Sequence, residues 1–332
     1  MATGLWAFGT AIVAFAITAV IGKFLIPFLR RLNFGQTILE EGPKWHKNKQ
    51  GTPTMGGIMF IIGIVIATTV AVLLHAMTSG GLDLVGRFVF AGLLFSLMNG
   101  GIGFIDDYVK VVKKRNLGLT AIQKLILQFL AAGLYLLVMA LCGDNTWILV
   151  PFKGYVDLGF FYYIIMAVVL VGMTNAVNLT DGIDGLDASI TFFAALFLML
   201  IANVIPFESN VIYSAAVAGG CMGFLVWNFH PAKCFMGDTG SLFLGGAVCS
   251  IAFAMDMHLM LILVGIMYLV EMFSVMLQVS YFKLTHGKRI FKMSPIHHHF
   301  EMCGWSEMKI VCVFSAVTAL AGIGALLLVI FS

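Results

Sequence analysis

Ten long apolar runs constrain this chain more than any other feature of its sequence. A helix needs about 17 to 25 mostly apolar residues to cross a bilayer, and the runs reach or approach that length. Charged residues make up only 11% of the 332 residues, whereas soluble domains carry about 25%. The runs therefore predict an all-α polytopic membrane protein, a single integral membrane domain of about ten transmembrane helices. The predicted spans are residues 5–29, 55–75, 88–105, 121–141, 160–176, 188–205, 211–229, 242–255, 259–282 and 309–331.

Lysines and arginines gather in alternate loops between these runs. Positive residues in short loops mark the cytoplasmic side of a membrane protein, so the pattern predicts an even number of spans with both termini outside. No basic residue precedes the first run, which is the reverse of a signal peptide. The net charge of +3 fits this topology and gives no reason to expect nucleic acid. The loops assigned to the cytoplasm hold Arg30, Arg31, Lys44, Lys47, Lys49, Lys110, Lys113, Lys114, Arg115, Lys233, Lys283, Lys288, Arg289 and Lys292, and those assigned to the outside hold Lys153 and Arg87.

One outer segment, residues 142–159, differs from the rest. It contains two short stretches of strand-forming residues on either side of Lys153 and Gly154. This pattern predicts a short β-hairpin, to which the sequence assigns no function.

The most polar short segment lies between the fifth and sixth runs, at residues 178–187. It reads Asn178-Leu-Thr-Asp-Gly-Ile-Asp-Gly-Leu-Asp. Its three aspartates recur every third residue, a spacing that would put them on one side of a helical turn. The two glycines let the backbone approach a ligand closely. The segment therefore predicts a site for a metal ion or a polyphosphate at one face of the membrane.

A second acidic motif, Asp106-Asp107-Tyr-Val-Lys110, follows the third run. Adjacent carboxylates near lipid are costly without a cation or proton partner. Mg²⁺ is the expected partner, because it takes oxygen ligands together with substrate phosphates. A solvated helix end with charges of both signs explains the pair equally well.

Asp238 lies in the motif Phe235-Met-Gly-Asp-Thr-Gly-Ser, at the start of the eighth run. Backbone amides at a helix N-terminus can hold phosphate, and a carboxylate there can hold a bridging ion. The alternative is an ordinary helix cap, because Asp, Thr and Ser are the residues that helix starts prefer.

Two further loops carry groups suited to phosphate. In the first cytoplasmic loop, Lys49 and Thr54 stand beside a Gly-Thr-Pro turn, and the lysine ammonium can grip a pyrophosphate. The topology rule alone also explains lysines at this place. The other loop reads Pro295-Ile-His-His-His-Phe-Glu301, and its histidines can hydrogen-bond to phosphate or bind a metal.

Glu271 is different because it lies inside the ninth run, with Gln278 seven residues later on the same helical face. An ionisable residue at that depth predicts either a functional group or a hydrogen-bonded pair that holds helices together.

Together the motifs predict transfer of a phosphoryl-linked group between a soluble phosphate and a lipid-borne one. Such transfer needs mainly positioning and charge neutralisation.

The motifs, taken in order, resemble the polyprenyl-phosphate N-acetylhexosamine 1-phosphate transferases. Within that superfamily, the loop His46-x-x-Lys49-x-Gly-Thr-Pro-Thr-Met-Gly-Gly and the triple histidine followed by Glu301 are similar to the phospho-N-acetylmuramoyl-pentapeptide transferase family. The likeness runs from residue 46 to residue 305.

The resemblance implies a Mg²⁺-dependent enzyme of peptidoglycan synthesis. It would convert UDP-N-acetylmuramoyl-pentapeptide and undecaprenyl phosphate into UMP and undecaprenyl-diphospho-N-acetylmuramoyl-pentapeptide, lipid I. It also implies a homodimer in the bacterial inner (cytoplasmic) membrane, with the active site facing the cytoplasm.

The resemblance further implies roles for individual residues. Asp106, Asp107 and Asp238 match the catalytic aspartates, and Asp238 also matches the Mg²⁺ ligand. Phe235 matches an aromatic residue that stacks on uracil. The positions that match substrate-binding residues are Lys49, Thr54, Lys110, Lys114, Asn178, Asp181, Asp184, Asn228, Phe235, Gln278, His297, His298 and His299.

Several alternatives stay open on sequence alone. The lipid phosphate can attack directly, with Asp106 or Asp107 taking its proton, or the reaction can pass through an aspartyl-phosphate intermediate. A sister enzyme that transfers N-acetylglucosamine 1-phosphate is the second candidate. A cation- or proton-coupled transporter is the third, although such proteins place ionisable residues near the bilayer midplane.

Overall fold

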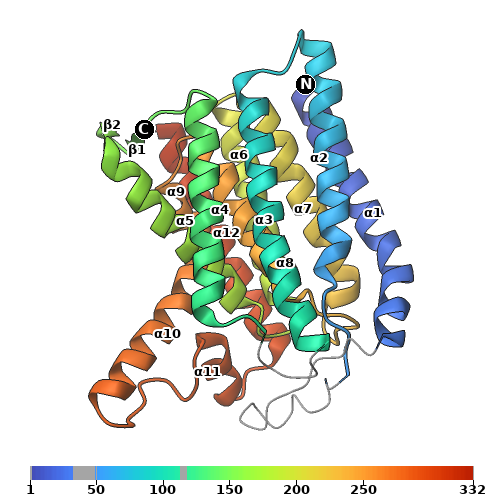
Figure 1. Ribbon diagram of the computed structural model, residues 1–332, viewed down its shortest axis with the longest axis vertical. Helices are drawn as coiled ribbons and strands as arrows, with labels where there is room; N and C mark the ends of the chain where they lie inside the picture. Colours follow the sequence, from blue (N-terminus) through green and yellow to red (C-terminus); the bar gives the residue numbers. More distant parts are fainter. Residues whose placement is uncertain (1, 33–48, 50, 113–117, 332) are drawn as a thin grey trace.

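The computed structural model describes residues 2–32, 49, 51–112 and 118–331. In these residues the chain forms helices and one two-stranded antiparallel hairpin, as predicted (Figure 1). The elements are α1 (Ala2–Arg31), α2 (Gly57–Ser79), α3 (Leu84–Val112), α4 (Ala121–Leu141), β1 (Trp147–Val150), β2 (Gly154–Asp157), α5 (Phe160–Thr180), α6 (Leu186–Val204), α7 (Glu208–Asn228), α8 (Gly237–Phe253), α9 (Met260–Val264), α10 (Ile266–Leu284), α11 (Ile296–Met302) and α12 (Glu307–Phe331).

Eight helices in the described residues are long and apolar enough to cross a bilayer, namely α1 to α7 and α12. This confirms a polytopic, all-helical membrane protein. The eighth predicted span is the shorter α8, of 17 residues. The ninth was predicted as one continuous helix over residues 259–282, and this is wrong. The chain breaks at Gly265 into α9 and α10, because glycine is a weak helix former and here caps the end of α9.

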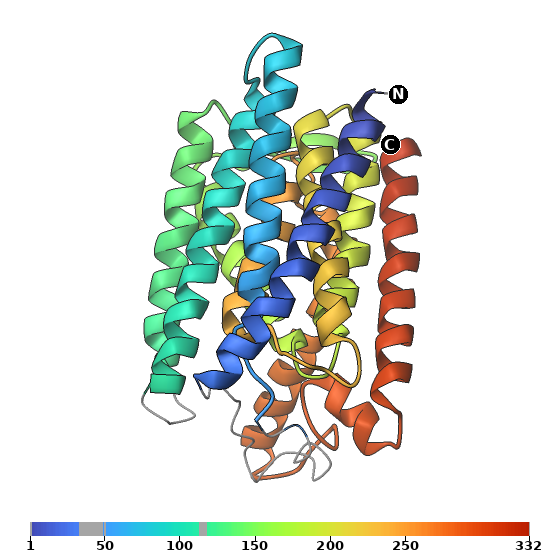
Figure 2. The same ribbon diagram turned by 90° about the vertical axis from the view of Figure 1, so that its right-hand side faces the viewer.

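The two ends of the bundle are different. Both described chain ends lie at one end in both views of the molecule (Figures 1 and 2), and Figure 1 shows the β1–β2 hairpin at the same end. The start of α8 and the whole of α11 lie at the other end. The helix α10 departs from the bundle direction and projects outward at that same end (Figure 1).

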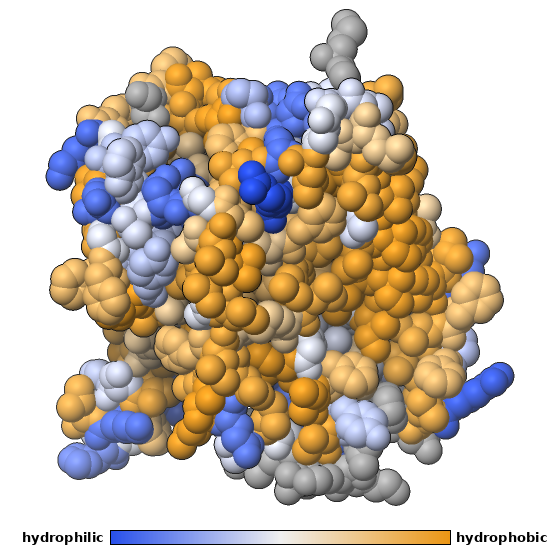
Figure 3. Space-filling view, turned by 45° about the horizontal axis from the view of Figure 1, so that its top comes forward, coloured by the Kyte–Doolittle hydropathy of each residue, from blue (hydrophilic) through white to orange (hydrophobic). Residues whose placement is uncertain are grey.

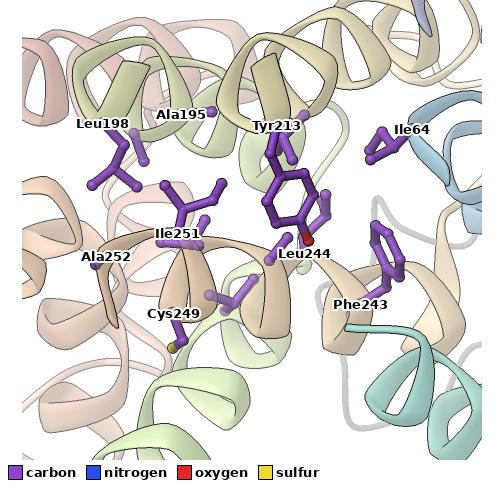
Figure 4. Packing of buried hydrophobic residues seen from close by; sticks show 14 of the residues in the cluster. Ile64, Ala195, Leu198, Tyr213, Phe243, Leu244, Cys249, Ile251 and Ala252 are labelled. Atoms are coloured by element: carbon purple, nitrogen blue, oxygen red, sulfur yellow. The ribbon is translucent and has the colours of Figure 1, made fainter. Parts of the chain in front are cut away.

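Helix α8 lies at the centre of the bundle. All residues from Thr239 to Phe253 are buried, and α3 and α5 pack along it. Figure 4 shows Leu244 and Ile251 of α8 among Tyr213 of α7 and Leu198 of α6. Many α8 residues are Gly, Ala, Ser or Cys, and such small side chains let transmembrane helices approach closely.

The outside of the bundle is apolar. A broad hydrophobic surface fills the middle of Figure 3, and hydrophilic residues gather towards its upper and lower parts. Such a surface suits contact with lipid.

Several helices extend beyond their predicted ends, and two of these extensions carry predicted site residues. The third span was expected to end at residue 105, but α3 continues to Val112, so Asp106, Asp107 and Lys110 lie on a helix and not in a loop. The fifth was expected to end at residue 176, but α5 continues to Thr180 and carries Asn178. A continuing helix fixes these side chains relative to the bundle.

Candidate active site

Three aspartates from distant parts of the sequence meet at the start of α8. Asp106 and Asp107 come from the last turns of α3, and Asp238 comes from the first turn of α8. Their nearest oxygens all lie within 4.8 Å of one another. We call these three residues the carboxylate cluster. Gly103 makes the approach possible, because a Cβ at this position would overlap the backbone carbonyl of Asp238.

Two lysines neutralise Asp238. Its Oδ2 atom accepts hydrogen bonds from Lys110 Nζ at 3.0 Å and from Lys124 Nζ at 2.7 Å. Lys110 Nζ also lies 2.6 Å from Asp106 Oδ2. Charge-assisted contacts of this kind are stronger than neutral hydrogen bonds.

Sequence reasoning missed Lys124. It lies in the first turns of α4, just after Thr120, whose side chain forms a capping box with Gln123. A cation near a helix N-terminus is unfavourable with the helix dipole. That mismatch was the available signal that Lys124 has an anionic partner elsewhere in the fold.

Asp107 serves as the cap of α8. Met236, at the N-cap position, makes no capping hydrogen bond with its side chain. Instead, Asp107 Oδ2 accepts from the backbone N–H of Thr239 at 2.9 Å and from its hydroxyl at 2.7 Å. The Oδ1 atom accepts from the N–H of Asp238 at 3.3 Å. Asp107 is therefore tied to helix α8 through both of its oxygens.

Asn178 and Asp181 join the carboxylate cluster from the other side. The Asn178 amide donates to Asp238 Oδ1 at 2.9 Å and to Ser241 Oγ at 2.8 Å. Burial, together with the charges of Asp238, Asp107 and Asp184, raises the pKa of Asp181 to about 8. The pKa of Asp181 is therefore raised by charges of the carboxylate cluster and by Asp184, which belongs to a neighbouring group of charges.

That neighbouring group, the Lys49 cluster, consists of Lys49, Asp184, His230 and Glu307. Lys49 Nζ donates to Asp184 Oδ1 and to Glu307 Oε2, both at 2.7 Å. Glu307 Oε2 also accepts from the N–H of Asp184 at 3.0 Å, and His230 Nδ1 lies 3.0 Å from Asp184 Oδ2. Sequence reasoning missed Glu307 and His230. An acidic residue in a first helical turn is expected anyway, and this hid Glu307.

The remaining predicted nucleotide residues surround the loop before α8. Asn228 is buried, accepts from the N–H of Gly185 at 3.0 Å and donates to the carbonyl of Cys234 at 2.9 Å. Phe235 is half-buried, and its backbone pairs with Pro53 and Gly56 beside Thr54. Lys114 lies outside the described residues.

The three histidines of α11 face different neighbours. His297 is buried, and its Nδ1 lies 3.1 Å from Glu271 Oε1. His298 Nδ1 lies 2.6 Å from Glu301 Oε2, and His299 Nδ1 accepts from the N–H of Lys292 at 3.1 Å.

Gln278 is bound to the loop before α11. Its Oε1 accepts from the N–H groups of Ile290 and Phe291, and it lines a cavity of about 370 Å³ with Lys283 and Arg289.

One predicted arrangement is wrong. Asp181, Asp184 and Asp187 do not share a side of one helical turn, because α5 ends at Thr180 and α6 begins at Leu186. Asp187 is buried instead on α6, where Thr191 donates to its Oδ1 at 3.2 Å.

The donor set of the carboxylate cluster suits a hard divalent cation. Mg²⁺ takes oxygen ligands and is bound in proteins through one or two carboxylates plus phosphates. Asp106, Asp107 and Asp238 together could hold such an ion. The surrounding lysines are placed to contact phosphate oxygens as point charges.

Comparison with known proteins gives the family. Residues 89–256 match the model of glycosyl transferase family 4, and residues 49–61 match signature 1 of phospho-N-acetylmuramoyl-pentapeptide-transferase. The phospho-N-acetylmuramoyl-pentapeptide-transferase of Bacillus subtilis is 48% identical over 318 residues, 95% of each chain. The chain belongs to the phospho-N-acetylmuramoyl-pentapeptide-transferase family.

Two other members of the phospho-N-acetylmuramoyl-pentapeptide-transferase family resemble this chain to about the same degree as the Bacillus subtilis protein. The protein of that name from Halalkalibacterium halodurans is 48% identical over 93% of each chain. The one from Heliobacterium modesticaldum is 47% identical over 97% of each chain. The family signature begins at Lys49, the residue that joins Asp184 to Glu307.

Proposed function

We propose that this protein transfers phospho-N-acetylmuramoyl-pentapeptide from UDP-N-acetylmuramoyl-pentapeptide to undecaprenyl phosphate, giving lipid I and UMP for peptidoglycan synthesis. The family membership supports this activity. The observation that carries it is the carboxylate cluster, which joins α3 to α8 and stands between lysines from α3 and α4. Phosphoryl transfer needs charged groups of this kind, because its catalysis depends on positioning the phosphates and neutralising their charge.

Each of the two clusters would bind a different part of the substrates. In this proposal the nucleotide lies at the Lys49 cluster with Asn228 and Phe235, and the two phosphates lie at the carboxylate cluster. Lys110 and Lys124 then bind phosphate oxygens, and Asn178 fixes Asp238. Asp181 is close enough to both clusters for the charges of Asp238, Asp107 and Asp184 to raise its pKa.

The chemical step proposed here is a direct attack. A phosphate oxygen of undecaprenyl phosphate forms a bond to the β-phosphorus of the UDP-sugar, and the bond from that phosphorus to the UMP oxygen breaks. Asp106 is the better candidate to take a proton from the lipid phosphate. Its Oδ2 is the one oxygen of the Asp106–Asp107 pair that accepts no backbone N–H among the described residues. Mg²⁺ held by the cluster would supply charge neutralisation for the departing UMP.

The proposal includes the setting of the reaction. The active-site end of the bundle faces the cytoplasm of a bacterial inner membrane, and both termini face outward. The support is the excess of lysine and arginine in the loops at that end, such as Lys233, Lys288 and Arg289. The homodimer implied by the family likeness belongs to the same proposal, and chemical crosslinking in native membranes would test it.

The decisive experiment follows radiolabel from the UDP-sugar into an organic-extractable lipid, using purified protein and undecaprenyl phosphate. We expect labelled lipid with UDP-N-acetylmuramoyl-pentapeptide and none with UDP-N-acetylglucosamine. Chelation of divalent ions should abolish the signal, and added Mg²⁺ should restore it. Label transfer from UDP-N-acetylglucosamine instead would assign the sister activity, and transfer that survives chelation would remove Mg²⁺ from the proposal.

A second measurement separates the two chemical routes. A direct attack predicts no exchange of labelled UMP into UDP-N-acetylmuramoyl-pentapeptide when the lipid acceptor is left out. Exchange without acceptor would establish a covalent intermediate on the protein.

A further inference from the structure

Glu271 is a fully buried carboxylate that the mechanism above does not use. It lies on α10, and none of its side chain is exposed. A buried carboxylate costs several kcal/mol unless it is paired, so its partner is informative. That partner is His297, the first histidine of α11.

Two contacts join Glu271 to His297. The imidazole Nδ1 lies 3.1 Å from Glu271 Oε1, and the backbone N–H of His297 donates to Oε2 at 3.4 Å. A carboxylate without a proton only accepts hydrogen bonds. A hydrogen on Nδ1 makes this approach to an ionised Glu271 favourable, so the pair favours the Nδ1–H tautomer.

The other ring nitrogen faces the Asp-rich turn. Neither ring nitrogen of His297 makes a well-formed hydrogen bond among the described residues, although the side chain is 99% buried. The ring lies against Gly182, because a Cβ built at Gly182 would overlap Nε2. Gly182 stands directly after Asp181 and two residues before Asp184, so Nε2 is aimed at the turn that links the two clusters.

We propose that Glu271 is a positioning residue of the transfer reaction. Its carboxylate holds Nδ1 of His297, so that the ring supports Gly182 and fixes the turn of residues 181–185, which carries Asp184. This inference rests on the proposed function. Glu271 acts only through His297 and never touches the substrate.

The test uses Glu271→Gln, which keeps the size of the side chain but lets an amide N–H face Nδ1. We expect kcat to fall about 10- to 100-fold, the range found when the outer partner of a metal-binding histidine is changed. The KM for UDP-N-acetylmuramoyl-pentapeptide and the melting temperature in detergent should stay near the wild-type values. Glu271→Asp retains a carboxylate and should recover part of the loss.

The matched control is Glu208→Gln. Glu208 Oε2 lies 3.0 Å from His75 Nε2, so this is a second Glu–His pair in the same molecule. It joins the first turn of α7 to α2 at the end of the bundle away from the site. Glu208→Gln should leave kcat unchanged.

A double-mutant cycle separates positioning from a structural role. If Glu271 acts only through His297, then adding Glu271→Gln to His297→Gln should cause no further fall in kcat. Full additivity of the two losses would overturn the proposal. So would a loss of melting temperature in Glu271→Gln that accounts for its loss of activity.

A measurement without turnover keeps this inference distinct from the proposed function. Nitrogen-15 NMR of histidine-labelled protein should report an Nδ1–H signal for His297 that is altered in Glu271→Gln. If the wild type makes no labelled lipid but this signal is as expected, then the proposed function fails and the pairing stands. An Nε2–H tautomer in the wild type would refute the pairing itself.

Discussion

Asp106 and Asp107 are neighbours in sequence, yet they have different partners. Asp107 accepts three hydrogen bonds from Asp238 and Thr239 and so completes the N-terminus of α8. Asp106 accepts from the N–H of Leu119 with one oxygen and meets Lys110 with the other. The pair therefore combines a structural cap with a group that is open to chemistry.

The cap leads to a stability prediction at Thr239. Thr239→Val removes only the hydroxyl that donates to Asp107, so we expect the free energy of unfolding to fall by about 1 kcal/mol. Thermal unfolding of the purified protein in detergent would measure the change. Thr239→Ser keeps the hydroxyl and serves as the control. A Val variant as stable as the Ser variant would argue against the cap.

Glu307 gives a second prediction at this scale. Glu307→Ala removes the contacts with Lys49 Nζ and with the N–H of Asp184. If the Lys49 cluster binds the nucleotide, the KM for the UDP-sugar should rise about tenfold, which corresponds to about 1.4 kcal/mol of binding free energy. Steady-state kinetics with saturating undecaprenyl phosphate would show it. An unchanged KM would place the nucleotide elsewhere.

At the scale of elements, the contact between α3 and α8 positions the site. Gly103 of α3 touches the backbone of Asp238, whereas Gly101, on the same helix, has no atom near the place where a Cβ would be. The two glycines therefore offer a matched pair of substitutions.

We expect Gly103→Ala to displace the start of α8 and to lower transfer activity more than 100-fold, with a lower melting temperature. A displacement of about 1 Å at a reacting group can cost that much. Gly101→Ala should keep full activity and can gain about 0.5–1 kcal/mol, because alanine loses less backbone entropy in a helix. Equal effects of the two variants, measured by the radiolabel assay and by melting, would contradict this account.

The elements also show what the sequence could predict. Helices α1 to α7 and α12 follow from their apolar runs, because length and hydropathy decide whether a segment spans a bilayer. The break at Gly265 did not follow, since a single glycine inside an apolar run is common in membrane helices. The motif residues of the carboxylate cluster were found. Lys124 and Glu307 were missed because their partners are more than 100 positions away.

At the scale of the whole molecule, a second group of acids lies at the end away from the site, where the hairpin joins the bundle. Burial raises the pKa of Asp256 from 3.8 to about 6, and the charge of Asp144 adds to this rise. Burial also raises the pKa of Asp144 to about 6. Nearby, burial lowers the pKa of His258 to about 4.

The signs of these shifts give a pH prediction. An acid that binds its proton more tightly when folded stabilises the fold at low pH, and this stability is lost as pH rises through about 6. Asp256→Asn should therefore raise the melting temperature at pH 8 by about 2 °C or more, and give no gain at pH 4. The positive φ of 56° at this position is one that asparagine tolerates.

The comparison with wild type at each pH cancels the contribution of His258, which acts in the opposite direction. The depressed pKa of His258 means that stability is lost as pH falls from about 6.5 towards 4. A pH-independent effect of Asp256→Asn would contradict the assignment.

The hydrogen bond from Lys49 to Glu307 bridges 258 positions and has a consequence for biosynthesis. A chain still emerging from the ribosome lacks this contact until its final helix has entered the bilayer. Copies that lack α12 cannot form this contact, so we expect them to bind the nucleotide sugar more weakly.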